Sequence, residues 1–374
     1  LFRSGKVIMK KQISILMAAV LMAGTLAGCG SKEAAPETTT AAPTTEATTE
    51  ATTAEETTTE AETTAAAGGL KTGMAIVSSM ESSKDAGEKD GNAQVDSTVA
   101  AVVVDADGKI VKCVLDVAQN KMAFTAEGKV IMKDEFKTKQ ELKEEYNMKP
   151  ASGIGKEWYE QAAAMEEFVI GKTAAEVKGI AVDEDNKPTD ADLAAGCTMA
   201  VGDFIEAISQ AAESAADLGT QEGDKLGLGV VTVMNEHTKD ATADAEGQCE
   251  AYSTYVATTT GADGKITASI IDCTQGVIKF DATGKITSDL TTGVKTKKQK
   301  GEEYGMRAAS GIGKEWFEQA AAMEEFMIGK TADEVKGIAV DEDNKPTDAD
   351  LTAGCTMSIG DFQECVVKAA ATAK

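Results

Sequence analysis

Two nearly identical stretches of the chain carry residue types that could hold a phosphate. They run from Ile180 to Thr198 and from Ile338 to Thr356, and each ends in Asp-x-x-Ala-Gly-Cys-Thr before a segment with helical periodicity. The unpaired N–H groups and the positive dipole end of a helix N-terminus favour a bound anion. The alternative is that the same residues only turn and cap the chain. The candidate phosphate-binding residues are Asp192, Gly196, Thr198, Asp350, Gly354 and Thr356.

A glycine-rich loop also occurs in both copies, directly before another helical segment. Ser152-Gly-Ile-Gly155 leads into Trp158, and Ser310-Gly-Ile-Gly313 leads into Trp316. Glycine lets the backbone approach a flat, anionic cofactor beside an aromatic ring, although a plain turn before a helix needs the same residues. The loop and the threonine stretch recur together, which is more informative than either one alone. The candidate cofactor-binding glycines are Gly153, Gly155, Gly311 and Gly313.

Other groups of residues that could form a catalytic or metal-binding site are scarce. His237 is the single histidine, lies in a polar stretch and has no counterpart in the other copy. This disfavours His-based nucleophilic catalysis and histidine-rich metal sites. The clusters Asp183-Glu-Asp185 and Asp341-Glu-Asp343 either offer oxygen ligands for a divalent cation or form solvated turns.

Cysteine spacing does not indicate a disulfide framework in each copy. Seven cysteines are present, and apart from Cys29 only Cys197 and Cys355 recur between the copies. The sequence leaves open whether Cys249 and Cys273 bridge neighbouring strands.

The N-terminal region resembles the signal of bacterial lipoproteins. Met9 is followed by two lysines, the segment 13–26 is apolar, and Leu-Ala-Gly-Cys ends at Cys29. The apolar segment is short for a spanning helix, although an uncleaved anchor is the alternative. The resemblance implies that residues 1–28 are a signal peptide, with a native start at Met9, and that Cys29 carries diacylglycerol. We therefore expect an extracytoplasmic protein anchored to membrane lipid at the cell membrane.

Composition separates the next segment from the rest of the chain. Residues 29–69 are dominated by Thr, Ala and Glu and have almost no large apolar side chains, so we expect a disordered tether. The whole chain has a formal net charge of −25, and its basic residues cluster only at the N-terminus and in the run 295–300. Binding to a phosphate backbone needs clustered Lys and Arg, so we expect no nucleic-acid partner.

The remainder is a tandem duplication, with expected domains at residues 70–220 and 223–374. Alternating apolar residues around Asp107-Gly108 predict a hairpin, with strands at 74–77, 97–104, 110–117, 122–124 and 130–132. Helical spacing follows at 156–170 and 203–216, and Thr173 to Glu176 forms a capping box. The predicted fold class is α+β, with an antiparallel sheet in each copy and helices packed on one side.

The order of these pieces resembles the FMN-binding domain of extracytoplasmic flavoproteins and of membrane electron-transfer complexes. Residues 103–111 match the hairpin of that family, residues 152–155 match its Gly-Ile-Gly loop, and residues 192–198 match its attachment motif. That motif is Asp, two variable residues, Ser or Thr, Gly, Ala, and then the Ser or Thr that receives FMN through a phosphoester. When this motif is aligned with the two stretches residue by residue, the resemblance implies that Thr198 and Thr356 are the residues that receive FMN.

The attachment motif departs from the family pattern at two positions in each copy. Ala195 and Ala353 stand where the family has a hydroxyl residue, and Cys197 and Cys355 stand where it has Ala. The sequence thus leaves open whether FMN is bound covalently.

The resemblance implies an electron carrier that holds FMN in each repeat and does not turn over a substrate of its own. Its implied partners are a flavin transferase and a redox partner in the membrane or outside the cell. A different hypothesis is a non-enzymatic surface lipoprotein whose duplicated domains bind a peptide, a polysaccharide or a cation. A solute-binding component of a transporter is less well supported, because such proteins usually have two α/β lobes with parallel strands.

Overall fold

The computed structural model describes residues 69–374. The predicted signal peptide, the lipidation site at Cys29 and the predicted tether up to residue 68 lie outside the described residues.

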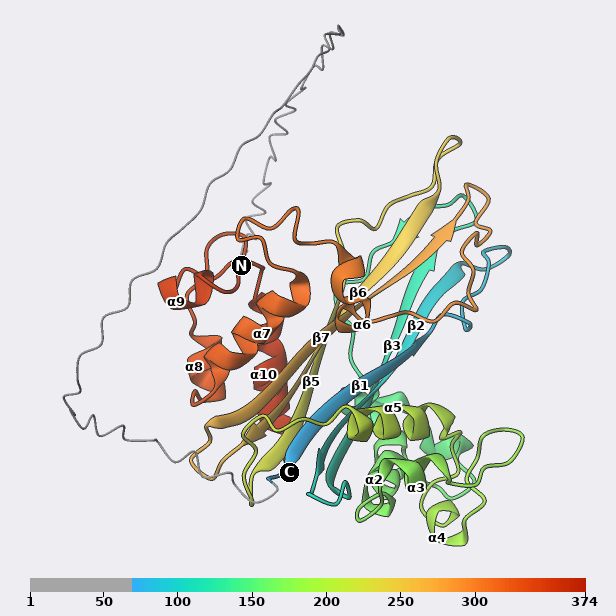
Figure 1. Ribbon diagram of the computed structural model, residues 1–374. Coiled ribbons are helices and arrows are strands. Elements are labelled where there is room, and N and C mark those ends of the chain that lie inside the picture. Colours follow the sequence, from blue (N-terminus) through green and yellow to red (C-terminus); the bar gives the residue numbers. More distant parts are fainter. Residues whose placement is uncertain (1–68) are drawn as a thin grey trace, which may run out of the picture. The chain divides into compact units, whose positions relative to one another are not determined.

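Each repeat begins with a meander of long antiparallel strands (Figure 1). The predicted hairpin turn at Asp107-Gly108 is present, and Gly108 has a φ of +75°, a backbone conformation that glycine adopts readily. The first sheet has the order β1-β2-β3-β4 and the second has the order β5-β6-β7. The strands are β1 (Lys71–Ser79), β2 (Gly91–Val104), β3 (Ile110–Phe124), β4 (Val130–Ile131), β5 (Lys225–Met234), β6 (Gly247–Thr260) and β7 (Ile266–Phe280).

Helices follow the strands in each repeat. In the first repeat they are α1 (Lys139–Leu142), α2 (Trp158–Phe168), α3 (Ala174–Lys178), α4 (Ala191–Ala194) and α5 (Gly202–Glu213). In the second they are α6 (Lys297–Lys300), α7 (Trp316–Met327), α8 (Ala332–Lys336), α9 (Ala349–Thr352) and α10 (Gly360–Thr372). Three 3₁₀ turns, η1 (Lys143–Tyr146), η2 (Lys149–Ala151) and η3 (Gly301–Tyr304), complete the connections. The capping box at Thr173 is formed as predicted, because the Thr173 and Glu176 side chains each bind the other residue's backbone N–H.

Both faces of the central strands are buried. In β2, Ala100 and Val102 pack against the helices of the first repeat, whereas Val99 and Ala101 face the second sheet and pack in a cluster that includes Tyr255. The two sheets therefore pack face to face, and the helices of each repeat cover the outer face of its own sheet (Figure 1). The predicted α+β class with antiparallel sheets and helices on one side is confirmed.

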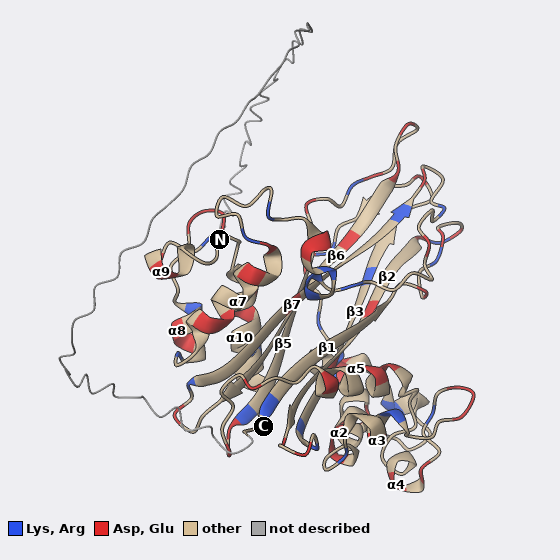
Figure 2. Cartoon of the chain, in the orientation of Figure 1, with Lys and Arg blue, Asp and Glu red and all other residues tan. Residues whose placement is uncertain are grey.

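Contacts between the sheets join the two repeats into one compact unit. The rings of Phe124 and Phe280 stack with their centroids 4.2 Å apart and their planes 8° apart. Asn120 Nδ2 donates a hydrogen bond of 3.1 Å to Ser253 Oγ in the other sheet. Acidic residues are spread over the helices and hairpin ends of both repeats (Figure 2), in line with the net charge of −25 for the whole chain.

Strand β3 is one strand of 15 residues, although the sequence predicts two shorter ones. Buried polar residues in and beside the predicted gap at 118–121 have partners inside the fold. Asn120 is bound to Ser253, and Asp116 Oδ1 accepts hydrogen bonds from the amides of Val117 and Gln140 at 2.7 and 3.1 Å. The strand therefore continues through them, because buried polar groups are tolerated once they are paired.

The buried carboxyl group of Asp116 predicts a pH-dependent stability. Asp116 is 7% exposed, and burial raises its pKa from 3.8 to about 6, despite hydrogen bonds from Thr138 and two backbone amides. Between these two values the folded protein binds more protons than the unfolded chain, so stability falls as pH rises, by about 3 kcal/mol in total. Urea unfolding of the wild type and of Asp116→Asn at pH 4 and pH 7 measures this loss. In the Asp116→Asn variant, the free energy of unfolding should fall less between pH 4 and pH 7 than in the wild type. An equal fall in both proteins would contradict the raised pKa of Asp116.

Candidate functional site

In the first repeat a buried glutamine joins the predicted threonine to the glycine loop. The backbone N–H of Thr198 donates to Gln161 Oε1 at 2.9 Å, and the hydroxyl of Thr198 lies 3.3 Å from the same oxygen. Gln161 Nε2 donates to Ser152 Oγ at 3.0 Å and to the carbonyl of Lys156 at 3.2 Å. The two candidate elements, which are distant in sequence, are thus brought together by one side chain.

The second repeat contains the same arrangement. Thr356 N and Oγ1 donate to Gln319 Oε1 at 2.9 and 3.2 Å, and Gln319 Nε2 donates to Ser310 Oγ at 3.1 Å. Both glutamines have no exposed surface. Our sequence analysis missed them, although their recurrence at the same place after Trp158 and Trp316 was a signal.

Glutamate caps fix the start of the helices that carry these glutamines. Glu157 and Glu315 are the N-caps of α2 and α7, and each forms a reciprocal capping box with the third residue of its helix. Their carboxylates also accept hydrogen bonds of 2.8 Å from the amides of Met148 and Met306. These bonds hold the 3₁₀ turns and the glycine loops against the helix N-termini.

The tryptophans after the loops are buried and packed edge-on against phenylalanines. The ring centroids of Trp158 and Phe204 are 6.0 Å apart, and those of Trp316 and Phe362 are 6.4 Å apart. Both Trp316 and Phe362 also line a pocket, so core packing and ligand contact are compatible roles for them.

The candidate glycines have different physical roles. A Cβ atom at Gly196 would lie 2.6 Å from Ala164 Cβ, so glycine there permits the close packing of the threonine segment on α2. Gly354 has the same contact with Ala322 in the second repeat. The remaining four lie in the two loops: Gly155 and Gly313 have φ of +63°, whereas Cβ atoms at Gly153 and Gly311 would meet nothing within 4 Å.

The predicted aspartates form no hydrogen bond with the threonine hydroxyls among the described residues. Asp192 and Asp350 are exposed in the first turn of α4 and α9, where Asp190 and Asp348 are the N-caps, and Asp350 is not among the residues that line the pocket. Helix α5 begins at Gly202, so Thr198 lies before the helix and its amide is taken by the glutamine.

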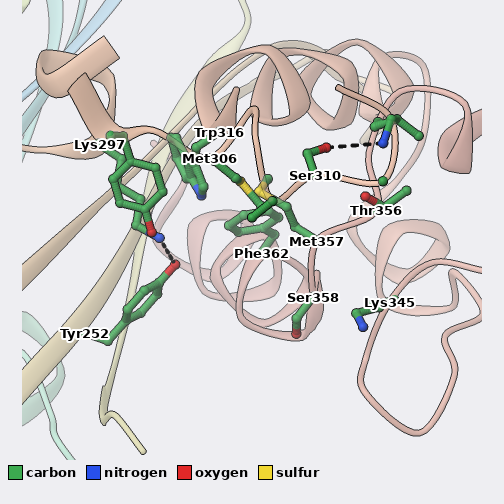
Figure 3. A pocket seen from close by; sticks show the side chains of 14 residues that line it. Tyr252, Lys297, Met306, Ser310, Trp316, Lys345, Thr356, Met357, Ser358 and Phe362 are labelled. Atoms are coloured by element: carbon green, nitrogen blue, oxygen red, sulfur yellow. Dashed lines mark hydrogen bonds between the residues drawn. The ribbon is translucent and has the colours of Figure 1, made fainter. Parts of the chain in front are cut away.

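A pocket of about 690 Å³ opens beside Thr356 in the second repeat (Figure 3). Its walls combine aromatic rings and methionines with a few polar groups, which is the usual composition of a site for a small organic ligand. The lining residues are Tyr252, Lys297, Tyr304, Met306, Ala309, Ser310, Gly311, Ile312, Trp316, Lys345, Thr356, Met357, Ser358 and Phe362.

A buried lysine lies among the aromatic rings of this pocket. Lys297 is 4% exposed, and its Nζ donates a hydrogen bond of 2.7 Å to the hydroxyl of Tyr252 (Figure 3). The same nitrogen lies 4.4, 4.7 and 5.3 Å from the ring centroids of Tyr252, Tyr304 and Trp316. Burial lowers the pKa of Lys297 to about 8, so at neutral pH it is a partly desolvated cation that the rings stabilise.

Two further cations lie near Thr356. Lys345 lines the pocket but is paired with Asp343 Oδ2 at 3.2 Å, and Lys314 Nζ lies 3.8 Å from the place that a Cβ atom would take at Gly354. Burial raises the pKa of Asp361, at the start of α10, so its carboxylate is less favoured than that of a free aspartate. Lys314 and the disfavoured charge of Asp361 therefore make the surroundings of Thr356 less negative than the overall charge suggests, whereas the charge of Lys345 is balanced by Asp343.

The other candidates from the sequence form no site among residues 69–374. His237 is exposed in a turn. Asp183 Oδ1 accepts hydrogen bonds of 2.9 Å from the amides of Asp185 and Lys187 and so closes its own turn, and Asp341 does the same in the second repeat. No group of three or more potential metal ligands occurs in this part of the chain.

All six cysteines of the described residues are buried free thiols. Cys249 and Cys273 lie on adjacent strands but are out of register, because Cys249 pairs with Ile278 and Cys273 pairs with Thr254. Burial raises the pKa of both thiols, to about 12 for Cys249 and about 11 for Cys273, which makes them unreactive.

Comparison with known proteins gives one partial similarity. The chain is 33% identical to a chlorophenol reductase of Desulfitobacterium hafniense, in a match that covers 20% of this chain and 33% of that protein. The chain thus spans about a third of the length of this curated relative. No family model and no solved structure matches the sequence. Within residues 69–374, every helix is too short or too polar to cross a membrane.

Proposed function

We propose that each repeat carries FMN, joined through its phosphate to Thr198 or Thr356, and that the protein is an extracytoplasmic electron carrier. The observation that carries this proposal is the pocket of about 690 Å³ that is lined both by aromatic rings and by Thr356. The size lies within the range of about 300 to 1,000 Å³ that is usual for small-molecule sites.

The residues of this pocket fit the chemistry of a flavin. Flat rings are recognised by aromatic side chains, and Tyr252, Trp316 and Phe362 supply them. The phosphate would be held near Lys314, whose ammonium group offsets its negative charge, and Lys345 would contribute if it turned from Asp343 to the phosphate. Once bound, the flavin would supply the redox chemistry, and the chain would supply its position and electrostatic surroundings.

The threonine is oriented but not activated by its neighbours. Thr356 Oγ1 donates its proton to Gln319 Oε1, which fixes the hydroxyl and leaves its lone pairs free to bond a phosphorus atom. Attachment forms the bond between Oγ1 and phosphorus, breaks the bond from phosphorus to the leaving group of the flavin donor, and releases the hydroxyl proton. A neutral amide is too weak a base to take that proton, so we assign catalysis of attachment to a separate flavin transferase, which would supply the donor.

The remaining parts of the chain fit a carrier held at a surface. Lipid on Cys29 would anchor the protein to the cell membrane, and the segment up to residue 68 would act as a tether, so that a membrane or extracellular redox partner can be reached. A phosphoester would keep the cofactor from being lost outside the cell. The partial similarity to a chlorophenol reductase is consistent with a redox role.

Alanine and serine substitutions at the two threonines test this proposal. In cells that also produce a flavin transferase, we expect Thr198→Ala and Thr356→Ala each to halve the flavin bound to the denatured protein, and the double variant to abolish it. Fluorescence of the protein band in a denaturing gel measures this. Thr356→Ser is the matched control, because it keeps the hydroxyl and should retain flavin. A wild-type protein without flavin would favour a surface module that binds a peptide, polysaccharide or cation.

A further inference from the structure

The two repeats differ in charge at one position that faces the candidate site. Strands β2 and β6 have the same length, and Asp96 of β2 occupies the place of Tyr252 in β6. Side chains alternate along a strand, so Asp96 lies on the helix-covered face with Ala100, as Tyr252 does with Val256. Because Tyr252 lines the pocket, one repeat has a carboxylate where the other has a phenol.

The rest of the aromatic cage is the same in both repeats. Lys139 Nζ lies 4.9 Å from the ring centroid of Tyr146 and 5.6 Å from that of Trp158. These three residues correspond to Lys297, Tyr304 and Trp316. A lysine beside two aromatic rings is thus common to both sites, although Lys297 is buried and Lys139 is only partly buried. The change from Tyr to Asp is a change in local charge.

Asp96 is held in place and acts on the groups around the first site. Gln94 Nε2 donates to both of its carboxylate oxygens, at 2.9 and 2.7 Å. Its field reaches Asp203 at the start of α5: burial raises the pKa of Asp203, the charge of Asp96 raises it further, and Lys139 opposes the rise.

The second repeat carries an acid on the same strand, but at a different place. Glu250 stands where the first repeat has Gln94, two residues or about 7 Å along the strand from Tyr252. It does not line the pocket, and its Oε1 accepts a hydrogen bond of 3.0 Å from Gln275. Its charge does reach the pocket wall, where it acts to raise the pKa of Lys297 and of Tyr304, although burial has the larger effect on both. Asp361, the counterpart of Asp203, has its pKa raised by burial and by Glu364, with no contribution from Glu250.

We infer that the two repeats hold their flavins at different reduction potentials, with Asp96 making the first flavin the harder one to reduce. This inference rests on the proposed function. Two-electron reduction of an isoalloxazine ring near neutral pH adds two electrons and one proton, so the ring gains one negative charge. A carboxylate beside the ring opposes that charge, whereas the Tyr252 hydroxyl does not. Electrons that enter the protein would therefore collect in the second repeat.

Proteins that carry a single flavin allow the two reduction potentials to be compared directly. Thr198→Ala leaves only the second site and Thr356→Ala leaves only the first, each made as the full chain together with a flavin transferase. Titration with dithionite, which supplies the electrons, in the presence of mediator dyes gives each potential from the flavin absorbance. We expect at least a tenfold difference in the reduction equilibrium constant, or about 30 mV for a two-electron couple.

Charge changes then identify the residue responsible. Asp96→Asn should raise the potential of the first site toward that of the second, and Tyr252→Asp should lower the second. Glu88→Gln, which removes an exposed loop carboxylate from the same repeat, is the control and should leave the potential unchanged.

The outcomes separate this inference from the proposed function. If both threonines carry flavin but the two potentials are equal or reversed, the inference alone is overturned. The same holds if Asp96→Asn does not change the potential of the first site. Flavin on neither threonine, measured before the titration by the absorbance of the purified proteins, overturns the proposed function and this inference with it.

Discussion

Replacing Gly229 by alanine is expected to destabilise the protein by about 4 kcal/mol or more, or to prevent folding. A Cβ atom at this position would lie 1.9 Å from the carbonyl oxygen of Cys365 and 2.9 Å from the amide nitrogen of Ala369, both in helix α10. These are backbone atoms, so the helix would have to move away from strand β5. That movement would also open the core under Phe362, which lines the pocket.

Urea unfolding followed by circular dichroism measures this loss. Gly87→Ala is the matched control, because a Cβ atom there would meet nothing within 4 Å, and its stability should stay within about 0.5 kcal/mol of the wild type. A Gly229→Ala protein as stable as the Gly87→Ala protein would show that α10 does not pack on β5 as described.

Replacing Gln319 by leucine should have the second largest effect. Leucine has a similar size but cannot bond the amide of Thr356, the hydroxyl of Ser310 or the carbonyl of Lys314. A buried polar group left unpaired costs about 1 to 3 kcal/mol, so we expect a total loss of about 3 kcal/mol or more. We also expect the second repeat to lose its flavin, because the threonine hydroxyl is no longer held.

Thermal and urea unfolding, together with the flavin content of each repeat, measure the two effects of Gln319→Leu. Gln210→Leu is the control: its amide bonds only Glu206 on the helix surface, and its effect should stay within about 0.5 kcal/mol. Gln161→Leu should show the same two effects in the first repeat. Normal flavin on Thr356 in the Gln319→Leu protein would contradict the positioning role.

The local chemistry of turns and helix starts could be predicted from the sequence. The Asp107-Gly108 hairpin and the capping box at Thr173 form because their determinants lie within a few residues of each other. The face-to-face packing of the sheets was not predicted, because it depends on contacts between the repeats. The nearly continuous apolar run from Val99 to Val104 in β2 was a sign that both faces of that strand are buried.

The candidate site was predicted only in part, for a similar reason. Thr198, Thr356 and the glycine loops are recognisable as short motifs, and the fold brings each threonine close to its loop. Gln319 and Lys297 were missed because their roles arise only when distant segments meet. Lys297 belongs to a basic run that looks solvated in the sequence, yet the fold buries it among three aromatic rings.

Mass mapping of the attachment sites tests the central claim most directly. The full chain would be produced together with a flavin transferase, digested with trypsin and analysed by tandem mass spectrometry. We predict two modified peptides, one containing Thr198 and one containing Thr356, each heavier by one FMN less one water, with the added mass on the threonine. Unmodified forms of both peptides, from a protein without flavin absorbance, would contradict the claim.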